Sequence, residues 1–276
     1  MQISDLYQIY LQCGMNVSTD TRKLGNGELF FALKGDNFNG NLFVEQALEK
    51  GAAYAVVDEG DFENSRIIKV EDALRSLQDL ARLHRQTLKT RVLGIGGSNG
   101  KTSTKELVVS VLSTEYNVHF THGNLNNHIG VPLTLLAMTA DTEIGIVEMG
   151  ANHAKEIAML CEITQPNIGY ITNFGKAHLE GFGGTEGVIK GKSELYEFLF
   201  ANQKTAFVNT DDAIQNDKTK NITNITFGLN TPENFVSISN IETNPMVKIE
   251  FENTIIQSHL IGLYNANNIN AAITIG

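Results

Sequence analysis

The stretch that decides the fold is Gly94–Leu112, which reads GIGGSNGKTSTKELVVSVL. An apolar run, Val92–Gly96, leads into a glycine-rich turn, and Lys101 opens a segment in which apolar residues recur with helical spacing. A strand, a glycine-rich turn, Lys-Thr and a helix are together typical of phosphate-binding loops, in which backbone N–H groups and the helix N-terminus hold anionic oxygens. We expect Lys101 to reach the terminal phosphates and the Thr102 hydroxyl to ligate Mg²⁺.

The glycine spacing differs from the usual phosphate-loop pattern. That pattern has its first glycine six residues before the lysine, where this chain has Ile95. The alternative interpretation is an ordinary glycine-rich turn that contains Gly-Lys-Thr by accident. The flanking strand and helix favour the phosphate loop.

The composition describes an ordinary globular protein. The chain has 276 residues, 42% of them hydrophobic and 19% charged, which is enough for two domains of ordinary size. No apolar run is long enough to span a membrane, and the N-terminus, MQISDLYQIY, lacks the pattern of an export signal. The only two cysteines, Cys13 and Cys161, are expected to be buried free thiols in a reducing compartment. A net charge of −10 disfavours nucleic-acid binding. We therefore expect a cytoplasmic protein that binds no nucleic acid and has no membrane span.

The first part of the chain mixes short strands and helices. Strands are predicted at residues 29–33, 53–57 and 66–70, and helices at residues 43–50 and from residue 71 to about residue 90. On the second helix His84 lies on the apolar stripe, so we expect a packed histidine rather than a ligand. A domain boundary is predicted near Lys89, giving domains 1–89 and 90–276.

The second part alternates apolar strands with helical stretches. Strands are predicted at residues 92–96, 144–149, 168–174 and 205–209, which favours an α/β domain with a mainly parallel sheet. Functional residues should then gather at the carboxyl ends of the strands. Between residues 222 and 263 the pattern changes to short alternating runs, which predict hairpins appended to the sheet.

Four features lie where a nucleotide site would need them. Glu148 ends an apolar strand and could hold Mg²⁺, or it could simply cap that strand. His178 follows a strand end and could ligate a metal, orient a phosphate or be a surface histidine. The third feature is a pair of lysines, Lys190 and Lys192, and such a pair is usually exposed to solvent. The fourth is a loop with Asn124, Asn126 and Asn127, which could bind a polar substrate or form a plain turn.

These segments together resemble the Mur ligase family of ATP-dependent amide-forming enzymes. The family's phosphate loop, Gly-Thr-Asn-Gly-Lys-Thr, corresponds to Gly97–Thr102 here, which accounts for the glycine spacing. GNLNNHIGVPLTLL (residues 123–136) and EMGAN (residues 148–152) resemble the branch of the family that adds a dipeptide. ITNFGKAHLEGFGG (residues 171–184) and the Lys192-Ser193-Glu194-Leu195 element also match in order and spacing.

The resemblance extends to both ends of the chain. VSTDTRKLGNGELFFALKGDNFNGN (residues 17–41) is similar to the family's uridine-nucleotide-binding domain, and Gly262–Asn268 is similar to an element whose asparagines lie against adenine. Three positions depart from the family pattern, namely His128 in place of glutamate, Asn39-Gly40-Asn41 in place of Asp-Gly-His, and Tyr264 in place of histidine.

The resemblance implies a set of functional residues and ligands. The implied cofactors are ATP and Mg²⁺, and the implied substrates are UDP-N-acetylmuramoyl-tripeptide and D-alanyl-D-alanine. Catalytic roles fall to Lys101, His178 and Lys192, with Lys192 carbamylated by CO₂ in the family pattern. ATP contacts are expected from Gly97, Ser98, Asn99, Gly100, Lys101, Thr102, Ser103, Asn265 and Asn268. Metal contacts are expected from Thr102, Glu148, His178 and Lys192. Substrate contacts are expected from Thr19, Asp20, Thr21, Arg22, Lys34, Gly35, Asn124, Asn126 and Asn127.

The fold expected from the resemblance is an N-terminal uridine-nucleotide-binding α/β domain followed by a central phosphate-loop α/β ATPase domain. Family members carry a third, C-terminal ligase domain that this chain is expected to lack, so the chain alone is expected to be inactive in ligation. We expect a monomer. Two alternatives remain, another Mur-type or folylpolyglutamate synthase-like amide ligase, and a nucleotide-binding module without ligase activity.

Overall fold

The computed structural model describes all 276 residues, which form two compact units. The first unit comprises residues 1–89 and 128–140, and the second comprises residues 90–127 and 141–276. Both this division and the sequence prediction have a break at Lys89. Residues 128–140 nevertheless pack with the first unit, although they lie within the predicted segment 90–276.

The first unit contains a parallel four-stranded sheet in the order β1-β2-β5-β6. Its elements are α1 (Ile3–Gln12), β1 (Val17–Ser18), β2 (Leu29–Phe31), β3 (Lys34–Gly35), β4 (Phe38–Asn39), the 3₁₀ turn η1 (Gly40–Phe43), α2 (Val44–Glu49), β5 (Tyr54–Val57), β6 (Ile67–Lys69), α3 (Ala73–Thr87) and α5 (Gly130–Leu136). The three predicted strands are present, each shorter than predicted. Apolar side chains of β2, β5 and α2 form a buried core in this unit.

Helix α5 joins the first unit because it packs on α3. The Tyr10 hydroxyl donates to the Leu136 carbonyl at 2.6 Å, and His84 Nε2 donates to the Met138 carbonyl at 2.8 Å. Burial lowers the pKa of His84, which therefore packs as a neutral side chain. The prediction of a packed histidine is confirmed.

The second unit is built on seven parallel strands in the order β13-β12-β11-β10-β7-β9-β8. Its elements are β7 (Arg91–Gly96), α4 (Lys101–Leu112), β8 (Val118–Phe120), β9 (Ile144–Glu148), α6 (Glu156–Thr164), β10 (Ile168–Ile171), α7 (Leu179–Phe182), α8 (Thr185–Ala201), β11 (Thr205–Asn209), α9 (Ala213–Thr219), β12 (Thr223–Leu229), β13 (Val236–Ile238), β14 (Asn240–Glu242), β15 (Lys248–Phe251), β16 (Thr254–Gln257) and α10 (Leu263–Ile275). The predicted α/β fold with a mainly parallel sheet is confirmed.

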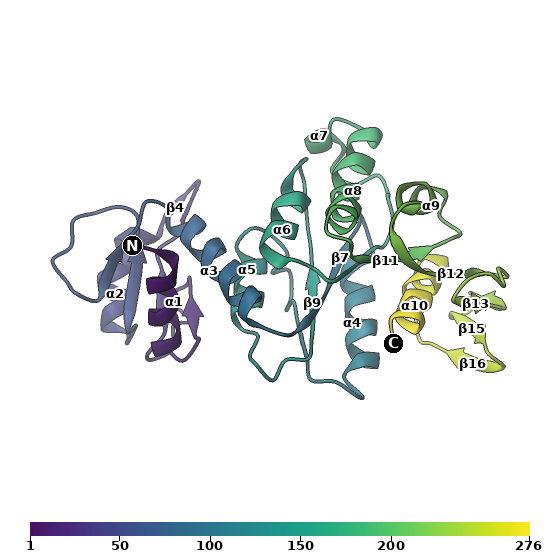
Figure 1. Cartoon of the computed structure of the whole chain (residues 1–276), viewed down its shortest axis with the longest axis horizontal. Helices are drawn as coiled ribbons and strands as arrows, with labels where there is room; N and C mark the ends of the chain where they lie inside the picture. The colour runs from purple at the N-terminus through teal and green to yellow at the C-terminus, as the bar shows by residue number, and fades with distance from the viewer. The chain divides into compact units, whose positions relative to one another are not determined.

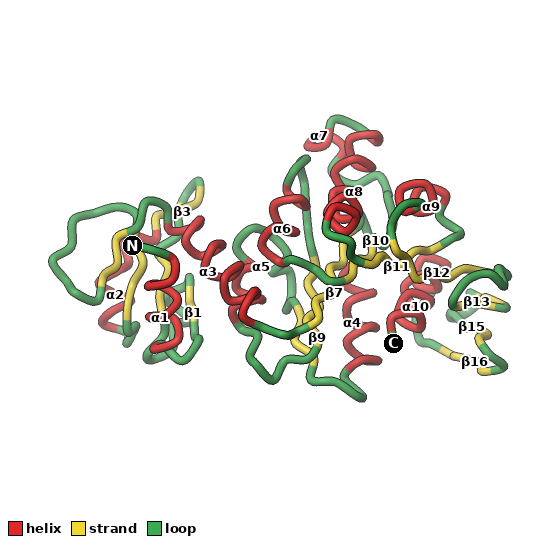
Figure 2. The backbone as a smooth tube through the Cα atoms, in the orientation of Figure 1, coloured by secondary structure: helices red, strands yellow, loops and turns green.

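Strand β7 shows why helices cover both faces of this sheet. Its Leu93 and Ile95 belong to the core formed with α4 and α10, which lie side by side (Figure 1, Figure 2). Gly94 and Gly96 face the other way, toward Leu195 of α8. Because side chains alternate along a strand, these glycines leave room for α8 to lie close to the sheet while the large residues fill the α4 side.

The sequence prediction for residues 222–263 is partly wrong. Strand β12 pairs in parallel with β11, and β13 pairs in parallel with β12, so both strands extend the main sheet instead of forming a hairpin. Only β14, β15 and β16 form the antiparallel hairpins that the alternating pattern predicts. Alternation indicates a half-buried strand but does not specify the direction in which that strand pairs.

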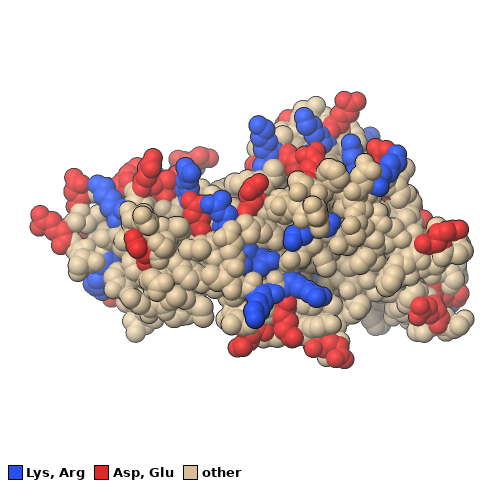
Figure 3. All heavy atoms as spheres, viewed as in Figure 1, with Lys and Arg blue, Asp and Glu red and all other residues tan.

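The remaining bulk features agree with the sequence. Cys13 and Cys161 are buried and unpaired, as predicted. None of the helices combines the length and the apolar character that crossing a membrane would require. On the face shown in Figure 3, acidic and basic side chains are interspersed.

Candidate functional site

The turn between β7 and α4 has the conformation of an anion cradle. Gly97 has φ +126° and Gly100 has φ +81°, and Gly100 stands directly before α4. No side chain caps the N-terminus of α4. The first N–H groups of a helix have no intrahelical partner, so this end is suited to an anion.

Gly97 is required for steric as well as conformational reasons. A Cβ at this position would clash with Thr172 Oγ1 and lie 2.9 Å from Thr172 N. We expect Gly97→Ala to lower the free energy of unfolding of the second unit by roughly 3 kcal/mol, since backbone strain and overpacking each cost about 1–3 kcal/mol. A urea titration followed by circular dichroism measures the change.

The matched control for this prediction is Gly123→Ala. Gly123 also has positive φ (+55°), but a Cβ there meets nothing within 4 Å, so the control carries the backbone strain without the clash. We expect the control to cost about 1 kcal/mol. An unfolding midpoint for Gly97→Ala no lower than that of Gly123→Ala would contradict the close approach to Thr172.

The phosphate loop is held in place by the residues that follow β10. Ser98 N donates to the Asn173 carbonyl at 3.0 Å, and Ser98 Oγ donates to the Gly175 carbonyl at 2.7 Å. Thr172 Oγ1 and Asn173 Nδ2 donate to the Asn99 carbonyl at 2.6 and 2.9 Å. Since β10 is the neighbour of β7 in the sheet, the two strand ends brace each other. The loop is therefore preorganised by contacts that sequence reasoning did not identify.

Lys101 folds back over the phosphate loop. Its Nζ donates to the carbonyls of Gly97 (2.9 Å) and Ser98 (3.2 Å). Burial lowers the pKa of Lys101, and the charge of Glu148 partly offsets that shift. The ammonium is thus held at the loop, near the carboxylate, where a phosphate oxygen could replace the carbonyls as its partner.

Thr102 and Glu148 are brought together as the sequence predicts. Thr102 Oγ1 donates to Glu148 Oε2 at 3.0 Å, and Glu148 is 1% exposed. Asn126 Nδ2 donates to the other carboxylate oxygen, Glu148 Oε1, at 2.8 Å. A Cβ on Gly150 would lie 2.8 Å from Asn126 Oδ1, so the glycine of EMGAN leaves room for the amide. The buried carboxylate is therefore satisfied by a hydroxyl and an amide.

The three loop asparagines, predicted to contact substrate, have different surroundings. Asn126 is engaged with Glu148 through its side chain and with Gly150 through its carbonyl, which accepts from Gly150 N at 2.7 Å. Asn124 and Asn127 are exposed. The structure thus places one of the three on the carboxylate and leaves the other two at the surface of the same loop.

Asn265 and Asn268, predicted to contact adenine, form a chain of hydrogen bonds from α10 to the start of α4, beside the phosphate loop. Asn265 Oδ1 accepts from Asn268 Nδ2 at 3.1 Å, and Asn268 Oδ1 accepts from Thr104 Oγ1 at 3.1 Å. A Cβ on Gly100 would lie 2.8 Å from Asn268 Oδ1. Both asparagines are buried, so α10 is joined to the start of α4 through polar contacts.

His178 lies in the turn that follows β10. It stands before α7 with a left-handed backbone (φ 54°, ψ 38°), and it is exposed. No group of three or more His, Cys, Asp and Glu side chains is placed to hold a metal ion, so His178 does not join Glu148 in such a cluster. Its metal-binding and catalytic roles stay predictions.

Lys192 is buried, so the alternative interpretation of the sequence, a lysine exposed to solvent, is wrong for this residue. It is 2% exposed, its Nζ donates to the Ala151 carbonyl at 2.8 Å, and it lies 5.0 Å from the centre of the Phe182 ring. Burial, followed by repulsion from Lys101, lowers the pKa of Lys192 to about 8. Lys190, by contrast, is exposed. Of the two lysines, Lys192 is therefore the buried one.

In the first unit the predicted substrate residues gather at the carboxyl ends of the parallel strands. After β1, the Arg22 guanidinium binds Asp20 in a bidentate pair at 2.7 and 2.9 Å, and this hydrogen-bonded pair holds the pKa of Asp20 well below its usual range. Thr21 Oγ1 donates to Gln46 Oε1 at 3.1 Å, and Thr19 is half-buried beside this turn. Arg22 is exposed, so its outer N–H groups can face a ligand.

Lys34, which follows β2, is paired with two carboxylates. Its Nζ lies 2.9 Å from Glu59 Oε1 and 3.3 Å from Asp58 Oδ1. Asn39 Nδ2 donates to Glu59 Oε2 at 2.8 Å, so the asparagine that departs from the family pattern joins this network. Gly35 is exposed in the adjacent hairpin. Sequence reasoning did not predict that Lys34 would be neutralised by Asp58 and Glu59.

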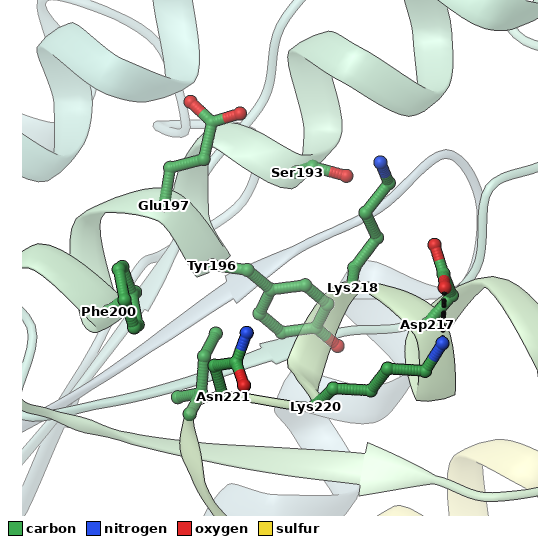
Figure 4. Close-up of a pocket in the computed structure, with 9 residues that line it drawn as sticks. Ser193, Tyr196, Glu197, Phe200, Asp217, Lys218, Lys220 and Asn221 are labelled. Carbon is green, nitrogen blue, oxygen red and sulfur yellow. Dashed lines mark hydrogen bonds and ion pairs between the residues drawn. The ribbon is translucent and has the colours of Figure 1, made fainter.

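A separate pocket of about 230 Å³ lies where α8 meets α9 and the turn before β12 (Figure 4). None of the predicted site residues lines it. Its lining residues are Ser193, Tyr196, Glu197, Phe200, Asp217, Lys218, Lys220, Asn221 and Ile222. Lys220 at its rim is paired with Asp217 at 2.7 Å.

Comparison with known proteins assigns the family. Residues 95–276 match the Mur ligase middle domain, and residues 15–85 match the Mur ligase family, catalytic domain. The chain belongs to the Mur ligase family. The family predicted from the sequence is therefore confirmed.

Individual relatives agree with this assignment. The Mur ligase chain is 41% identical over 270 residues to the UDP-N-acetylmuramoyl-tripeptide–D-alanyl-D-alanine ligase of Bacillus subtilis (strain 168), a match that covers 94% of this chain and 58% of that relative. MurF from Acinetobacter baumannii has a similar structure, with a TM-score of 0.83 and 31% identity over 94% of this chain and 58% of its own. The MurF ligase from Thermotoga maritima, solved in complex with ADP, has a TM-score of 0.80 and 28% identity over 94% of this chain and 61% of its own. The chain thus spans about three fifths of the length of these relatives.

Proposed function

We propose that this Mur ligase chain supplies the UDP-substrate-binding and ATP-binding parts of a ligase that joins D-alanyl-D-alanine to UDP-N-acetylmuramoyl-tripeptide. The observation that carries the proposal is the contact of Thr102 with Glu148, beside Lys101, at the carboxyl ends of two parallel strands. The 41% identity to a ligase of this description supports the choice of substrates.

The residues present fit both ATP and Mg²⁺. The uncapped start of α4 and the left-handed glycines suit phosphate oxygens. Thr102 Oγ1 and Glu148 Oε2 lie 3.0 Å apart, and both are oxygen donors of the kind that Mg²⁺ prefers. A bound Mg²⁺ would neutralise phosphate charge, and Thr102 and Glu148 would hold it.

The proposed reaction needs charge neutralisation more than covalent help. The terminal carboxylate of the tripeptide attacks the γ-phosphorus of ATP, ADP leaves, and an acyl phosphate results. The amine of D-alanyl-D-alanine then attacks the acyl carbon, inorganic phosphate leaves, and the amine loses a proton. Lys101 would stabilise the negative charge that gathers around the transferred phosphoryl group. His178 is proposed to assist from the loop after β10.

The substrate assignment is tested by calorimetry with a set of ligands. We expect the chain to bind UDP-N-acetylmuramoyl-tripeptide more tightly than the corresponding dipeptide compound, and not to bind folate. Preference for the dipeptide compound would favour another Mur-type ligase, and preference for folate would favour a folylpolyglutamate synthase-like enzyme. Absence of binding to every UDP compound would favour a nucleotide-binding module without ligase chemistry.

The chain by itself is expected to make little or no ligated product. It spans 58% of the B. subtilis relative, and we propose that the remaining length of such ligases positions the incoming amine. Positioning contributes several kcal/mol in reactions of this kind. The measurement compares product formed per molecule by this chain and by that relative, using mass spectrometry. Ligation by the chain at a rate near that of the relative would contradict the expectation.

A further inference from the structure

Lys105 is a buried lysine that the proposed reaction does not use. It lies on α4, one helical turn beyond Lys101, and it is 0% exposed. Lysine is rarely buried completely, because removing an ammonium from water is costly unless the charge is paired and hydrogen-bonded. The position therefore calls for a specific structural reason.

The ammonium of Lys105 is held by three partners. Its Nζ donates to the Thr121 carbonyl at 2.6 Å, the shortest of these contacts, and lies 2.9 Å from Glu106 Oε1. It also lies 5.4 Å from the centre of the Phe120 ring, within the range of a cation–π contact. Phe120 ends β8 and Thr121 follows it, so Lys105 ties α4 to the end of that strand.

Thr121 connects Lys105 to Glu148. It is fully buried, its N donates to the Ile146 carbonyl at 3.0 Å, and its Oγ1 accepts from Glu148 N at 3.0 Å. With Lys105 on its carbonyl, Thr121 has a partner for its N–H, its carbonyl and its hydroxyl. The loop that brings Asn126 onto Glu148 begins at this residue.

We propose that Lys105 is a positioning residue that holds Glu148 against Thr102 by fixing Thr121. Thr102 and Lys105 are three residues apart on α4, so they lie on neighbouring parts of one helix surface. Thr102 contacts the Glu148 side chain, and Lys105 fixes the residue that binds the Glu148 main chain. The inference rests on the proposed function, in which Glu148 and Thr102 hold Mg²⁺.

The quantity that tests this inference is the Mg²⁺-linked gain. We define it as the affinity of the chain for a non-hydrolysable ATP analogue in Mg²⁺ divided by the affinity in EDTA. Groups that orient metal ligands typically change metal affinity 10- to 100-fold when they are replaced. We expect Lys105→Met to lower the Mg²⁺-linked gain about tenfold. The affinity in EDTA and the affinity for UDP-N-acetylmuramoyl-tripeptide should each stay within about twofold, because neither depends on Glu148.

The matched controls separate positioning from general damage. Lys190→Met removes an exposed lysine of the same unit and should leave the Mg²⁺-linked gain unchanged. Glu106→Gln removes the ion pair but keeps the contact of Lys105 with Thr121, so it should also retain the gain. A purely structural role would lower the affinities in Mg²⁺ and in EDTA together.

A second pair of variants decides the matter if Lys105→Met does not fold. Thr121→Val removes the hydroxyl that accepts from Glu148 N, while Thr121→Ser keeps it. We expect the valine variant to lose the gain and the serine variant to keep it. Retention of the full gain by folded Lys105→Met, or equal loss in both Thr121 variants, would overturn the inference. Absence of any gain in the unchanged chain would instead contradict the proposed metal site on which it rests.

Discussion

Lys101→Ala should lower the affinity of the chain for an ATP analogue about 100-fold, and leave its affinity for UDP-N-acetylmuramoyl-tripeptide within about twofold. Charge-assisted hydrogen bonds contribute about 1.5–3 kcal/mol each, so losing the lysine from the phosphates costs about 3 kcal/mol. In a full-length ligase of this kind the same substitution should abolish ATP turnover, because the same charge is needed as phosphoryl transfer proceeds. The residues proposed for UDP binding, such as Arg22, are on the other unit. Calorimetry with both ligands measures the two affinities.

The control for this prediction is Lys190→Ala, which removes an exposed lysine and should change neither affinity. Lys101→Ala also frees the carbonyls of Gly97 and Ser98, so its unfolding midpoint should be recorded beside that of the unchanged chain. If a folded Lys101→Ala chain loses affinity for both ligands equally, the division into a UDP-binding unit and an ATP-binding unit is wrong.

Lys192→Ala is expected to have the second large effect, because we propose that Lys192 reacts with CO₂. The neutral amine forms an N–C bond, one carbon–oxygen π bond opens to give a carboxylate oxygen, and a proton leaves the nitrogen. The carbamate is an oxygen donor of the kind that Mg²⁺ prefers. With a pKa of about 8, about a tenth of Lys192 is neutral at pH 7, against fewer than about one in a thousand for an ordinary lysine.

The carbamate predicts a specific dependence on pH. Because the neutral amine is the reactive form and the pKa of Lys192 is lowered to about 8, the carbamate should increase as the pH rises from 7 to 9 at constant dissolved CO₂. Carbon-13 NMR with labelled CO₂ should detect a protein-bound carbamate signal in the unchanged chain and in Lys190→Ala that is missing from Lys192→Ala.

The same variant tests the role of the carbamate. Lys192→Ala should lose most of the Mg²⁺-linked gain, and short-chain carboxylates such as formate or acetate should restore part of it by taking the place of the carbamate. If Lys192→Ala keeps the full Mg²⁺-linked gain without any added carboxylate, a role of Lys192 in metal binding is ruled out.

The phosphate loop could be predicted because its determinants are local. A strand, positive-φ glycines and an amphipathic helix are all encoded between residues 92 and 112, and Lys101 and Thr102 have fixed places within that sequence. Glu148 could be predicted because it ends an apolar strand, and in a parallel sheet the carboxyl ends of the strands meet at one edge.

Other features depend on contacts between distant residues, which a local pattern does not contain. Nothing near α5 in the sequence indicates that it packs on α3, with Tyr10 and His84 binding carbonyls of residues 136 and 138. The parallel direction in which β12 and β13 pair likewise depends on the neighbouring strands of the sheet, not on the alternation of polar and apolar residues within each strand.

The burial of polar side chains at the site could not be predicted from the sequence either. Lys105 has the sequence context of a solvated helix lysine, and its burial depends on Thr121, 16 residues away. Asn126 has the context of a turn residue, and its engagement with Glu148 depends on the neighbouring strand. Pairings of this kind between elements decide which polar residues become part of a site.

We propose that this chain holds UDP-N-acetylmuramoyl-tripeptide and ATP at the same time, at separate sites. The most direct test is a calorimetric titration of UDP-N-acetylmuramoyl-tripeptide into the chain already saturated with the ATP analogue and Mg²⁺. We predict one-to-one binding, with the ATP analogue retained on the protein. No binding of the tripeptide compound, or its binding only by displacement of the ATP analogue, would contradict the account.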